Sequence, residues 1–455
     1  MMSTVLDEDR LRKIKEKISQ GMMPQWILND PAIFDEEIEK VFAHAWQLLG
    51  HESELKEPGS YITRWLVHDP ILVVRTKKGE IKAFLNSCPH RGMQLCTADF
   101  GKKNTFQCPY HGWSFNNDGK LIGVVAGDKV YGEGMDKEQW GLKPVPQVAT
   151  YNGLIFGCLD ANTMPLEEYL GGMKWYFDIL LNRSDGGMEV RGVPQRWILN
   201  ANWKLTSENF GGDPYHVATV HRSTVELGIS PQDPLFSGYG YQVVLDHGHN
   251  VNINTGVPGL DIPPYQGMPE EMWPMFQKNL TAEQHDILSK CTVIVGNCFP
   301  NLSFLSPLHG SEGHLHNYLN MRVWRPISAD KIEVWSWFMI DKAAPEAYKQ
   351  ASYKGYIASF GPSGTLEQDD AEIWARVTQA SKGILARDKD LSYNNVLNYM
   401  MGEGKVEPLD HWDGPGVAYP TCYVDYASRN MHEFWLSLLT GDVNLRQSAV
   451  HSEIK

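Results

Sequence analysis

The sequence has no long apolar run, no excess of positive charge and few cysteines, and each shortage argues against a class of protein. No apolar stretch approaches the roughly 20 residues that a membrane-spanning helix needs. The formal net charge of −14 argues against nucleic acid or an anionic membrane surface as the main partner. Seven cysteines in 455 residues do not form the pattern of a disulfide framework. The first residues lack the apolar core of a secretory signal, so we expect a reducing cytoplasm as the compartment.

Cofactor motifs with a glycine-rich phosphate loop are missing as well. The sequence contains no GxGxxG or Walker loop, and it has no C-x4-C-x2-C ferredoxin run. We therefore predict that this chain binds neither a flavin nor a nicotinamide. No internal repeat or low-complexity segment is present.

The length and the pattern of apolar residues predict an α+β fold with more than one domain, since 455 residues exceed what one core usually organises. Residues 1–45 are predicted to be a helical segment, with helices near 4–20 and 35–45, that packs on the catalytic domain. Residues 46–165 contain short runs rich in β-branched and aromatic residues, so an all-β domain is expected there. Residues 166–455 mix helical and strand patterns and are predicted to form a larger domain, in which helices flank an antiparallel sheet.

The most specific pattern is a C-x-H-x17-C-x2-H motif formed by Cys88, His90, Cys108 and His111. Each arm offers one thiolate and one imidazole from a tight loop that contains proline and glycine. Two interpretations compete, a tetrahedral zinc site and a Rieske [2Fe–2S] centre in which two histidines bind one iron. Zinc fingers usually pair like ligands within an arm, whereas here each arm pairs unlike ligands. The spacing therefore favours the Rieske centre.

A second pattern, D-x-x-H-x4-H, is formed by Asp213, His216 and His221. On a helix Asp213 and His216 would share a face, close enough for a carboxylate-to-imidazole hydrogen bond. His221 would lie about 140° around the helix from His216, so both can bind one ion only if the helix ends or distorts between them. Taken alone, this pattern fits two ordinary helix histidines equally well.

A two-histidine iron site needs one carboxylate to complete a facial triad. A predicted helix over 364–377, with Thr365 and Gln368 as its capping box, offers several candidates. The acidic residues in it are Glu367, Asp369, Asp370 and Glu372.

Helical periodicity separates these carboxylates. An apolar stripe runs along the predicted helix through Leu366, Ile373, Trp374 and Val377. Asp370 fills the missing position of this stripe, where a carboxylate needs a partner such as a metal ion. The other three acids are expected to face solvent, so we predict Asp370 as the third ligand.

These motifs together resemble the large (α) subunits of Rieske non-haem iron aromatic-ring-hydroxylating dioxygenases. The resemblance covers essentially the whole chain, from the β-rich Rieske region to an E-N-x3-D-x-Y-H-x4-H segment at 208–221. Within that family the chain is most similar to enzymes of the naphthalene and polycyclic aromatic hydrocarbon type.

The resemblance implies a terminal oxygenase that takes electrons from a ferredoxin, itself served by a ferredoxin reductase. Such an enzyme inserts both atoms of O2 into an aromatic ring and gives a cis-dihydrodiol; the alternative is dihydroxylation or monohydroxylation of an aromatic carboxylate. The implied cofactors are one [2Fe–2S] cluster and one mononuclear Fe(II) per chain. A homotrimer of α, or an α3β3 assembly with a small β subunit, is also implied.

The resemblance also assigns roles around the mononuclear iron. Asp213 would link this iron to His111 of a neighbouring subunit's cluster, and Asn209 would approach the iron. Phe210 and Val217 would line the substrate pocket.

The remaining histidines and cysteines are expected to be structural. His247 with His249, and His314 with His316, form H-x-H pairs without a third ligand nearby, so hydrogen bonding within strands or loops is the expected role. His309 is retained, with His314 and His316, as a candidate for the pocket wall. The other five cysteines, Cys96, Cys158, Cys291, Cys298 and Cys422, are expected to be buried fillers.

Overall fold

A computed structural model describes residues 6–132, 135–226, 238–259, 261–311, 314–392 and 406–446. The chain forms two compact units, a larger one from the described parts of 1–41 and 167–444 and a smaller one from those of 42–166 and 445–455. Helices and antiparallel sheets are both present, which confirms the predicted α+β class. Within the described residues, no helix combines the length and apolarity needed to cross a bilayer.

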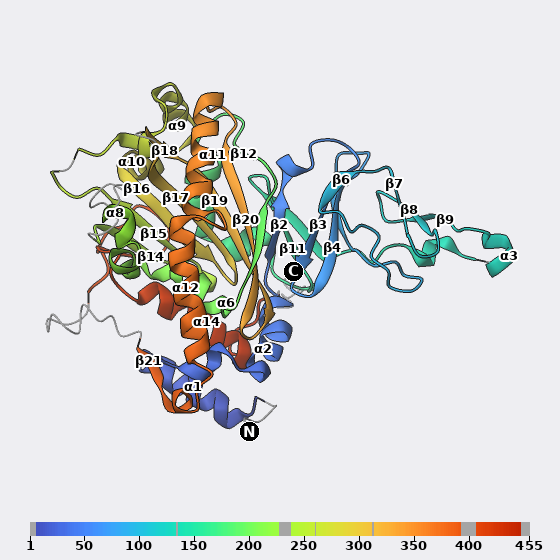
Figure 1. Ribbon diagram of the computed structural model, residues 1–455, viewed down its shortest axis with the longest axis horizontal. Coiled ribbons are helices and arrows are strands. Elements are labelled where there is room, and N and C mark those ends of the chain that lie inside the picture. The colour runs from blue at the N-terminus through green and yellow to red at the C-terminus, as the bar shows by residue number, and fades with distance from the viewer. Residues whose placement is uncertain are drawn as a thin grey trace, which may run out of the picture. The chain divides into compact units, whose positions relative to one another are not determined.

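The smaller unit is built from three short antiparallel sheets (Figure 1). Their strand orders are β5-β4-β3-β6, β10-β11-β2 and β7-β8-β9. The strands are β2 (Gln47–His51), β3 (Ser60–Leu66), β4 (Asp69–Arg75), β5 (Ile81–Leu85), β6 (Phe100–Lys102), β7 (Thr105–Gln107), β8 (Ser114–Asn116), β9 (Leu121–Gly123), β10 (Gln147–Tyr151) and β11 (Leu154–Cys158). The turn at 117–120 joins β8 and β9. The Asn116 side chain stabilises this turn by accepting hydrogen bonds from the backbone N–H groups of Asp118 and Lys120.

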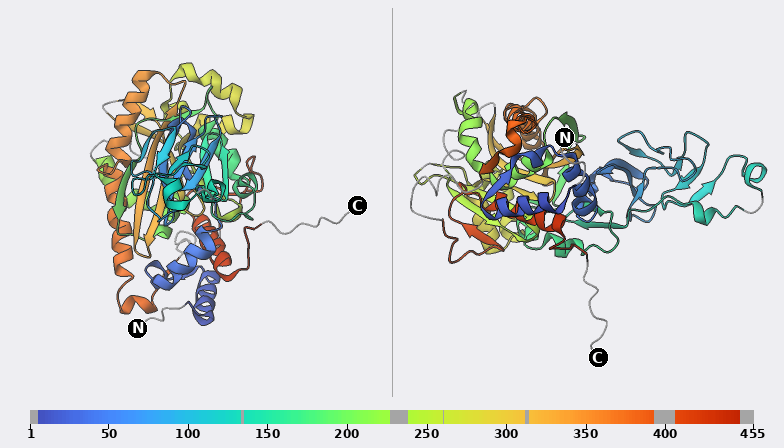
Figure 2. Two further views of the ribbon diagram at one scale, coloured as in Figure 1. Left: turned by 90° about the vertical axis from the view of Figure 1, so that its right-hand side faces the viewer. Right: turned by 90° about the horizontal axis from the view of Figure 1, so that it is seen from below.

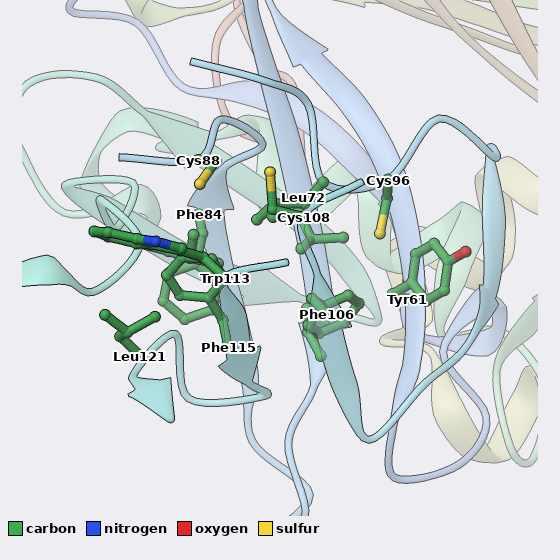
Figure 3. Packing of buried hydrophobic residues seen from close by; sticks show 13 residues of the cluster. Tyr61, Leu72, Phe84, Cys88, Cys96, Phe106, Cys108, Trp113, Phe115 and Leu121 are labelled. Carbon is green, nitrogen blue, oxygen red and sulfur yellow. The ribbon is translucent and has the colours of Figure 1, made fainter. Parts of the chain in front are cut away.

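An aromatic core holds the smaller unit together (Figure 3). Tyr61 meets Phe106 edge to face with ring centroids 5.6 Å apart, an arrangement that aromatic pairs prefer. The sulfurs of Cys88 and Cys108 lie at one edge of this core, and Trp113 lies below them, as Figure 3 shows. The same core therefore supports both cysteine-containing loops.

The larger unit is organised around one antiparallel sheet with the order β12-β20-β19-β17-β16-β15-β14-β22. In addition, β13 pairs with β20 and β18 with β17, while β1 and β21 form a separate pair. The strands are β1 (Met22–Pro24), β12 (Met188–Val190), β13 (Gln195–Leu199), β14 (Gly240–Val244), β15 (Asn250–Thr255), β16 (Cys291–Cys298), β17 (Leu302–Ser311), β18 (His314–Asn317), β19 (Leu319–Ser328), β20 (Lys331–Asp341), β21 (Asp390–Ser392) and β22 (Val417–Tyr419).

Helices cover both faces of this sheet, and the long helices α11 and α12 run along one side of it (Figure 2). On that face lie α6 (Trp203–Gly212), α11 (Glu346–Phe360), α12 (Thr365–Ala380) and α14 (Tyr426–Thr440). On the other face lie α5 (Met173–Leu181), α9 (Trp273–Asn279) and α10 (Ala282–Lys290). There Phe177 of α5 packs on Phe304 of β17 with ring centroids 5.3 Å apart.

The N-terminal segment is anchored to the larger unit by one buried carboxylate. Helix α1 (Glu8–Ser19) lies within the helix expected over 4–20. Helix α2 (Pro31–Glu37) begins earlier than the helix expected over 35–45 and continues into one π-helical turn, η2 (Ile38–Phe42). The Glu37 carboxylate accepts hydrogen bonds from the indoles of Trp203 and Trp435 and from the ammonium of Lys204 at 2.6–2.9 Å. Because a buried charge needs such partners, Glu37 joins α2 to α6 and α14.

Candidate metal centres and active site

The two cysteine–histidine loops, residues 88–93 and 108–113, have the same backbone design. In each loop the cysteine N–H donates to the carbonyl five residues later, at 2.8 Å for Cys88 and 2.7 Å for Cys108. The glycine four residues after the cysteine donates back to the cysteine carbonyl, and both Gly92 and Gly112 have φ near +70°. Since only glycine adopts that conformation without strain, the glycines of the motif are required by the turn.

The side chains of these loops converge on one place. Both cysteines are 2% exposed, and burial together with the neighbouring Cys108 thiol raises the pKa of Cys88 to about 11. The rings of His90 and His111 meet edge to face, with centroids 4.5 Å apart. His111 Nδ1 is buried and has no hydrogen-bond partner among the described residues. Two buried thiols and an unpartnered imidazole nitrogen fit the donor set of a [2Fe–2S] cluster with two thiolate and two imidazole ligands.

Aromatic side chains fix the outer histidine of this group. The His90 ring stacks on Trp113 with centroids 4.9 Å apart and planes 8° from parallel. The Tyr131 hydroxyl, at the end of α3 (Gly127–Tyr131), lies 3.2 Å from His90 Nε2. Because Nε2 is occupied by this contact, Nδ1 is the nitrogen of His90 that remains for a metal.

The helix that leads to the second pair of histidines ends before it reaches them. Helix α6 stops at Gly212, and Asp213 leaves the helical conformation with φ −124° and ψ 60°. A short 3-10 turn, η5 (Pro214–His216), and one helical turn, α7 (Val217–Val220), then carry the chain to His221. The helical face expected to hold Asp213 and His216 is therefore absent, and the distortion that binding of one ion by both histidines requires is present. It places their ring centroids 5.3 Å apart.

Helix α12 supplies a carboxylate to these two imidazoles. Asp370 Oδ1 lies 3.4 Å from His216 Nε2 and 3.3 Å from His221 Nε2. All three side chains can present one ligand atom to a common metal ion, with these atoms within 4.8 Å of one another. Two imidazoles and one carboxylate form the facial donor set typical of non-haem Fe(II) sites.

Electrostatics couple these three groups even without an ion. Burial alone would lower the pKa of His216, but the carboxylates of Asp370 and Asp213 raise it to about 9. Burial alone would raise the pKa of Asp370, and the two histidines instead lower it well below its ordinary range. A bound metal cation replaces the proton that otherwise links such groups, since ligating histidine must be neutral.

The outer nitrogens of both histidines have acceptors of their own. His216 Nδ1 contacts the backbone carbonyl of Asp213, while the Asp213 carboxylate lies 3.6 Å away. His221 Nδ1 lies 3.4 Å from Asp369 Oδ2. Such partners fix the tautomer and direct Nε2 toward a metal. Asp369 was expected to face solvent, and its contact with His221 corrects that expectation.

Three further expectations for α12 were wrong. No capping box forms: Gly364 is the N-cap without a side-chain hydrogen bond, and the Gln368 amide donates to the Pro362 carbonyl at 2.6 Å. Glu367, expected in solvent, is fully buried and forms an ion pair with Arg322, whose side chain is also fully buried. The apolar stripe is narrower than expected, because Ile373 is 46% exposed.

A pocket opens directly on the two histidines and Asp370. Asn209 and Phe210 of α6 line it together with Val217, and the Asn209 amide nitrogen lies 3.4 Å from His216 Nε2. The sheet contributes most of the remaining wall with mostly apolar side chains, and Phe360 of α11 and Leu366 of α12 also line the pocket. The lining residues from the sheet are Asn254, Val293, Val295, Leu305, Pro307, Leu308 and His309.

His247, His249 and the five cysteines outside the cluster motif have the expected structural roles. His247 Nδ1 and His249 Nε2 both contact the Tyr169 carbonyl at 2.9 Å, and His249 Nδ1 accepts from the Phe299 N–H. All seven cysteines are buried and unpaired by disulfides. Of the candidates for the pocket wall, His309 lines it, whereas the His314 side chain lies outside the described residues.

Comparisons with known proteins assign both regions to families. The Rieske [2Fe-2S] domain family matches residues 45–142, and the catalytic domain of the ring-hydroxylating alpha subunits matches residues 166–439. The chain therefore belongs to the family of ring-hydroxylating α subunits, which are oxidoreductases with a Rieske cluster and a non-haem iron. The enzyme class and the cofactor set expected from the sequence are thereby confirmed.

Individual relatives match over nearly the whole chain. The α subunit of an N,N-dimethyl phenylurea N-demethylase from Sphingobium sp. strain YBL2 is 32% identical over 96% of this chain and 95% of its own. The biphenyl 2,3-dioxygenase α subunit of Rhodococcus jostii strain RHA1 is 32% identical over 92% and 89%. The structure of naphthalene 1,2-dioxygenase from Rhodococcus sp. bound to indole matches with a TM-score of 0.92 and 42% identity, covering 96% of this chain and 100% of that one.

Proposed function

We propose that the chain is a terminal oxygenase α subunit that adds both atoms of O2 to an uncharged polycyclic aromatic hydrocarbon, giving a cis-dihydrodiol. The observation that carries this proposal is a mostly apolar pocket that opens on His216, His221 and Asp370. An aromatic ring bound there would rest against aliphatic and aromatic side chains beside the metal position. The relatives named for naphthalene and biphenyl oxygenation support the same substrate class.

The charge of the pocket favours a neutral substrate over an aromatic carboxylate. Among the described lining residues there is no lysine or arginine, and Asp213 and Asp370 contribute negative charge. Arg322 lies behind the wall, where it is fully buried and paired with Glu367. A carboxylate entering this pocket would lose its hydration without gaining a cationic partner, which is unfavourable.

We infer that Cys88, His90, Cys108 and His111 hold the [2Fe–2S] cluster. The matching loop geometry and the unpartnered His111 nitrogen support this assignment. Purified protein is expected to contain two cluster irons per chain and to show a Rieske-type electron paramagnetic resonance signal on reduction. Zinc as the sole metal of these loops would refute the assignment.

We infer likewise that His216, His221 and Asp370 hold the mononuclear iron. When bound, the cluster supplies single electrons and the mononuclear iron supplies the activation of O2. The Asp213 carbonyl and the Asp369 carboxylate keep the outer histidine nitrogens occupied, so that both Nε2 atoms face one point. Phe210 and Val217 exclude water on the substrate side, and Asn209 presents an amide next to His216.

The assembly is proposed to be a trimer of α, alone or with three small β subunits, in which Asp213 accepts from His111 of the neighbouring subunit. The Asp213 side chain is 38% exposed, so its carboxylate retains free lone pairs for such a contact. Apolar side chains are exposed around the cluster loops, as expected of a surface that a second copy covers. They are Tyr110, Val125, Val130, Tyr131 and Trp140, each between 40% and 63% exposed.

The electron donor is proposed to be a ferredoxin with its reductase, in the cytoplasm. The relatives are named as subunits or as the large component of oxygenase systems, which supports a separate electron supply. The chain itself offers no GxGxxG loop for a nicotinamide.

A second candidate function is oxidative N-demethylation of an arylurea. It is favoured by the 32% identity to an N-demethylase α subunit over 96% of this chain. The two functions differ in product, because dioxygenation places both oxygen atoms on the ring and demethylation places one oxygen on the departing methyl carbon.

The deciding experiment is to reconstitute the oxygenase with a ferredoxin and a ferredoxin reductase under 18O2. Naphthalene, phenanthrene, biphenyl, phthalate and an N,N-dimethyl phenylurea are supplied separately, and products are identified by mass spectrometry. We expect dihydrodiols with two labelled oxygens from the hydrocarbons and no product from phthalate. Formation of the demethylated urea as the main product would establish the second function instead.

A further inference from the structure

Two polar side chains in the wall of the pocket have no partner in the protein. His309 and Asn254 are 5% and 3% exposed, and both line the pocket. Neither side chain makes a hydrogen bond to any other described residue. No polar side-chain atom of either residue is among the fully buried, unpartnered atoms of the described residues, so both groups have surface open to the pocket. These two groups are therefore available to something that enters the pocket.

The strand register places His309 at the end of the pocket that is remote from the metal position. The start of β17 lies next to the end of α6. Ser303 on β17 pairs with Asn297 of β16, and a Cβ added to Gly211 of α6 would lie 3.1 Å from the Asn297 side chain. Alternate residues of a strand share a face, so the pocket wall continues along β17 through Leu305 and Pro307 to His309. The lining stretch from Leu305 to His309 covers four residue steps, or roughly 13 Å.

The metal end of the pocket is the α6 end. Asn209 of α6 lies 3.4 Å from His216 Nε2, and the carboxylate of Asp370 lies 3.4 Å from the same atom. A ring bound for oxidation must lie next to these groups. The other end of an extended substrate would then point along β17 toward His309.

The ring of His309 is held on its other sides and is neutral. Its centroid lies 5.6 Å from that of His316 and 6.3 Å from that of Tyr318. Burial, reinforced by the neighbouring His316, lowers the pKa of His309 to about 4. A neutral imidazole offers one donor and one acceptor, so it pairs with a hydroxyl or a ring N–H without introducing charge.

We propose that His309 is a substrate-positioning residue that hydrogen-bonds a hydroxyl or ring N–H on the part of a fused-ring aromatic substrate that is not oxidised. This inference rests on the proposed oxygenation of fused-ring aromatics and extends its substrate class to members that carry a hydroxyl or a ring N–H. Asn254 lies two strands from His309, on β15 beside Val293 of β16, and is the competing candidate because its side chain is similarly buried and likewise has no hydrogen bond to another described residue.

The test compares 2-naphthol with naphthalene in the full oxygenase, supplied with ferredoxin and reductase. The measured quantity is the ratio of kcat/KM for 2-naphthol to kcat/KM for naphthalene. His309→Phe keeps a ring but removes both nitrogens, and we expect it to lower this ratio about 3- to 10-fold, as the loss of one hydrogen bond implies. His309→Gln retains a donor and an acceptor and is expected to preserve the ratio. Asn254→Leu, at the other unpartnered side chain of the wall, tests the competing assignment.

A binding measurement separates positioning from a structural role. Dissociation constants of both compounds are measured anaerobically with the oxidised enzyme, where no turnover occurs. His309→Phe is expected to weaken 2-naphthol by the same factor as the kinetic ratio and to weaken it more than naphthalene. An unchanged ratio in His309→Phe, or an equal fall in Asn254→Leu, overturns the proposal. If wild-type enzyme with both metal centres oxidises neither compound, the proposed function itself fails.

Discussion

Helix α12 offers a direct test of the mononuclear site, because adjacent carboxylates contact different atoms there. Asp370 Oδ1 lies within 3.4 Å of Nε2 of both histidines, whereas Asp369 Oδ2 reaches only the outer nitrogen of His221. Asp370→Ala is expected to lose the mononuclear iron and all oxygenation, because two imidazoles alone do not complete the facial set. Asp369→Ala is expected to retain the iron with reduced affinity.

The expected loss of iron affinity in Asp369→Ala can be sized from the geometry of its contact with His221. Removing the acceptor of a ligating histidine typically weakens metal binding 10–100-fold. The Asp369 contact is long, at 3.4 Å, and its side chain is 28% exposed, so water can replace it in part. We therefore expect the low end, about 10-fold or about 1.4 kcal/mol.

The assay is iron per chain after dialysis against a graded series of an Fe(II) chelator. The Rieske signal in the same samples reports that the cluster is intact. Glu372→Ala is the matched control on the same helix, since Glu372 is 61% exposed and, among the described residues, pairs only with Arg376 at 2.7 Å. If Asp370→Ala keeps its iron while Asp369→Ala loses it, the carboxylate assignment is reversed. If Glu372→Ala behaves like Asp369→Ala, the effect is general to the helix.

Three further predictions concern the route between the centres, the support of α12 and the cluster. Asp213→Ala is expected to keep both metal centres, because the backbone carbonyl of residue 213 still contacts His216 Nδ1. Product formation is expected to fall to background, and wild-type turnover with both centres loaded would contradict this. Glu367→Leu leaves its fully buried arginine partner without a counterion, and we expect a loss of about 3–5 kcal/mol in the free energy of unfolding by denaturant titration; a smaller loss would mean that the pair is already solvated. Tyr131→Phe removes the acceptor for His90 Nε2 and is expected to raise the reduction potential of the cluster, measured by redox titration. Tyr110→Phe removes the hydroxyl of a 58% exposed residue whose ring lies 3.8 Å from that of His111, and it should leave that potential unchanged. Equal shifts in both variants would refute the role of the hydrogen bond.

The Rieske motif could be interpreted from sequence because its geometry is local. All four candidate ligands lie in two short loops, and each loop is closed by hydrogen bonds between residues four or five apart. The glycines that these turns need are visible in the sequence as Gly92 and Gly112. The spacing of His216 and His221 was visible in the sequence for the same reason. The break in the helix between them could be stated only as a condition for both histidines to bind one ion.

The surroundings of α12 could not be predicted in this way, since a helix does not by itself determine which neighbours will pack on it. Periodicity selected Asp370, but it assigned Glu367 to solvent. In the structure Glu367 is instead buried against Arg322, which lies on a strand 45 residues earlier in the chain. It also missed the contact of Asp369 with His221, which lies 148 residues away.

The sequence by itself determined the fold class, the family and the candidate ligands, because those depend on short-range spacing. Only the tertiary structure decided which polar groups are paired. His309 and Asn254 are ordinary strand residues in the sequence, and their lack of partners appears only when β15, β16 and β17 are brought together under α6. Hydrogen-bond satisfaction is a property of the packed molecule, since every buried donor and acceptor depends on atoms that the rest of the chain supplies.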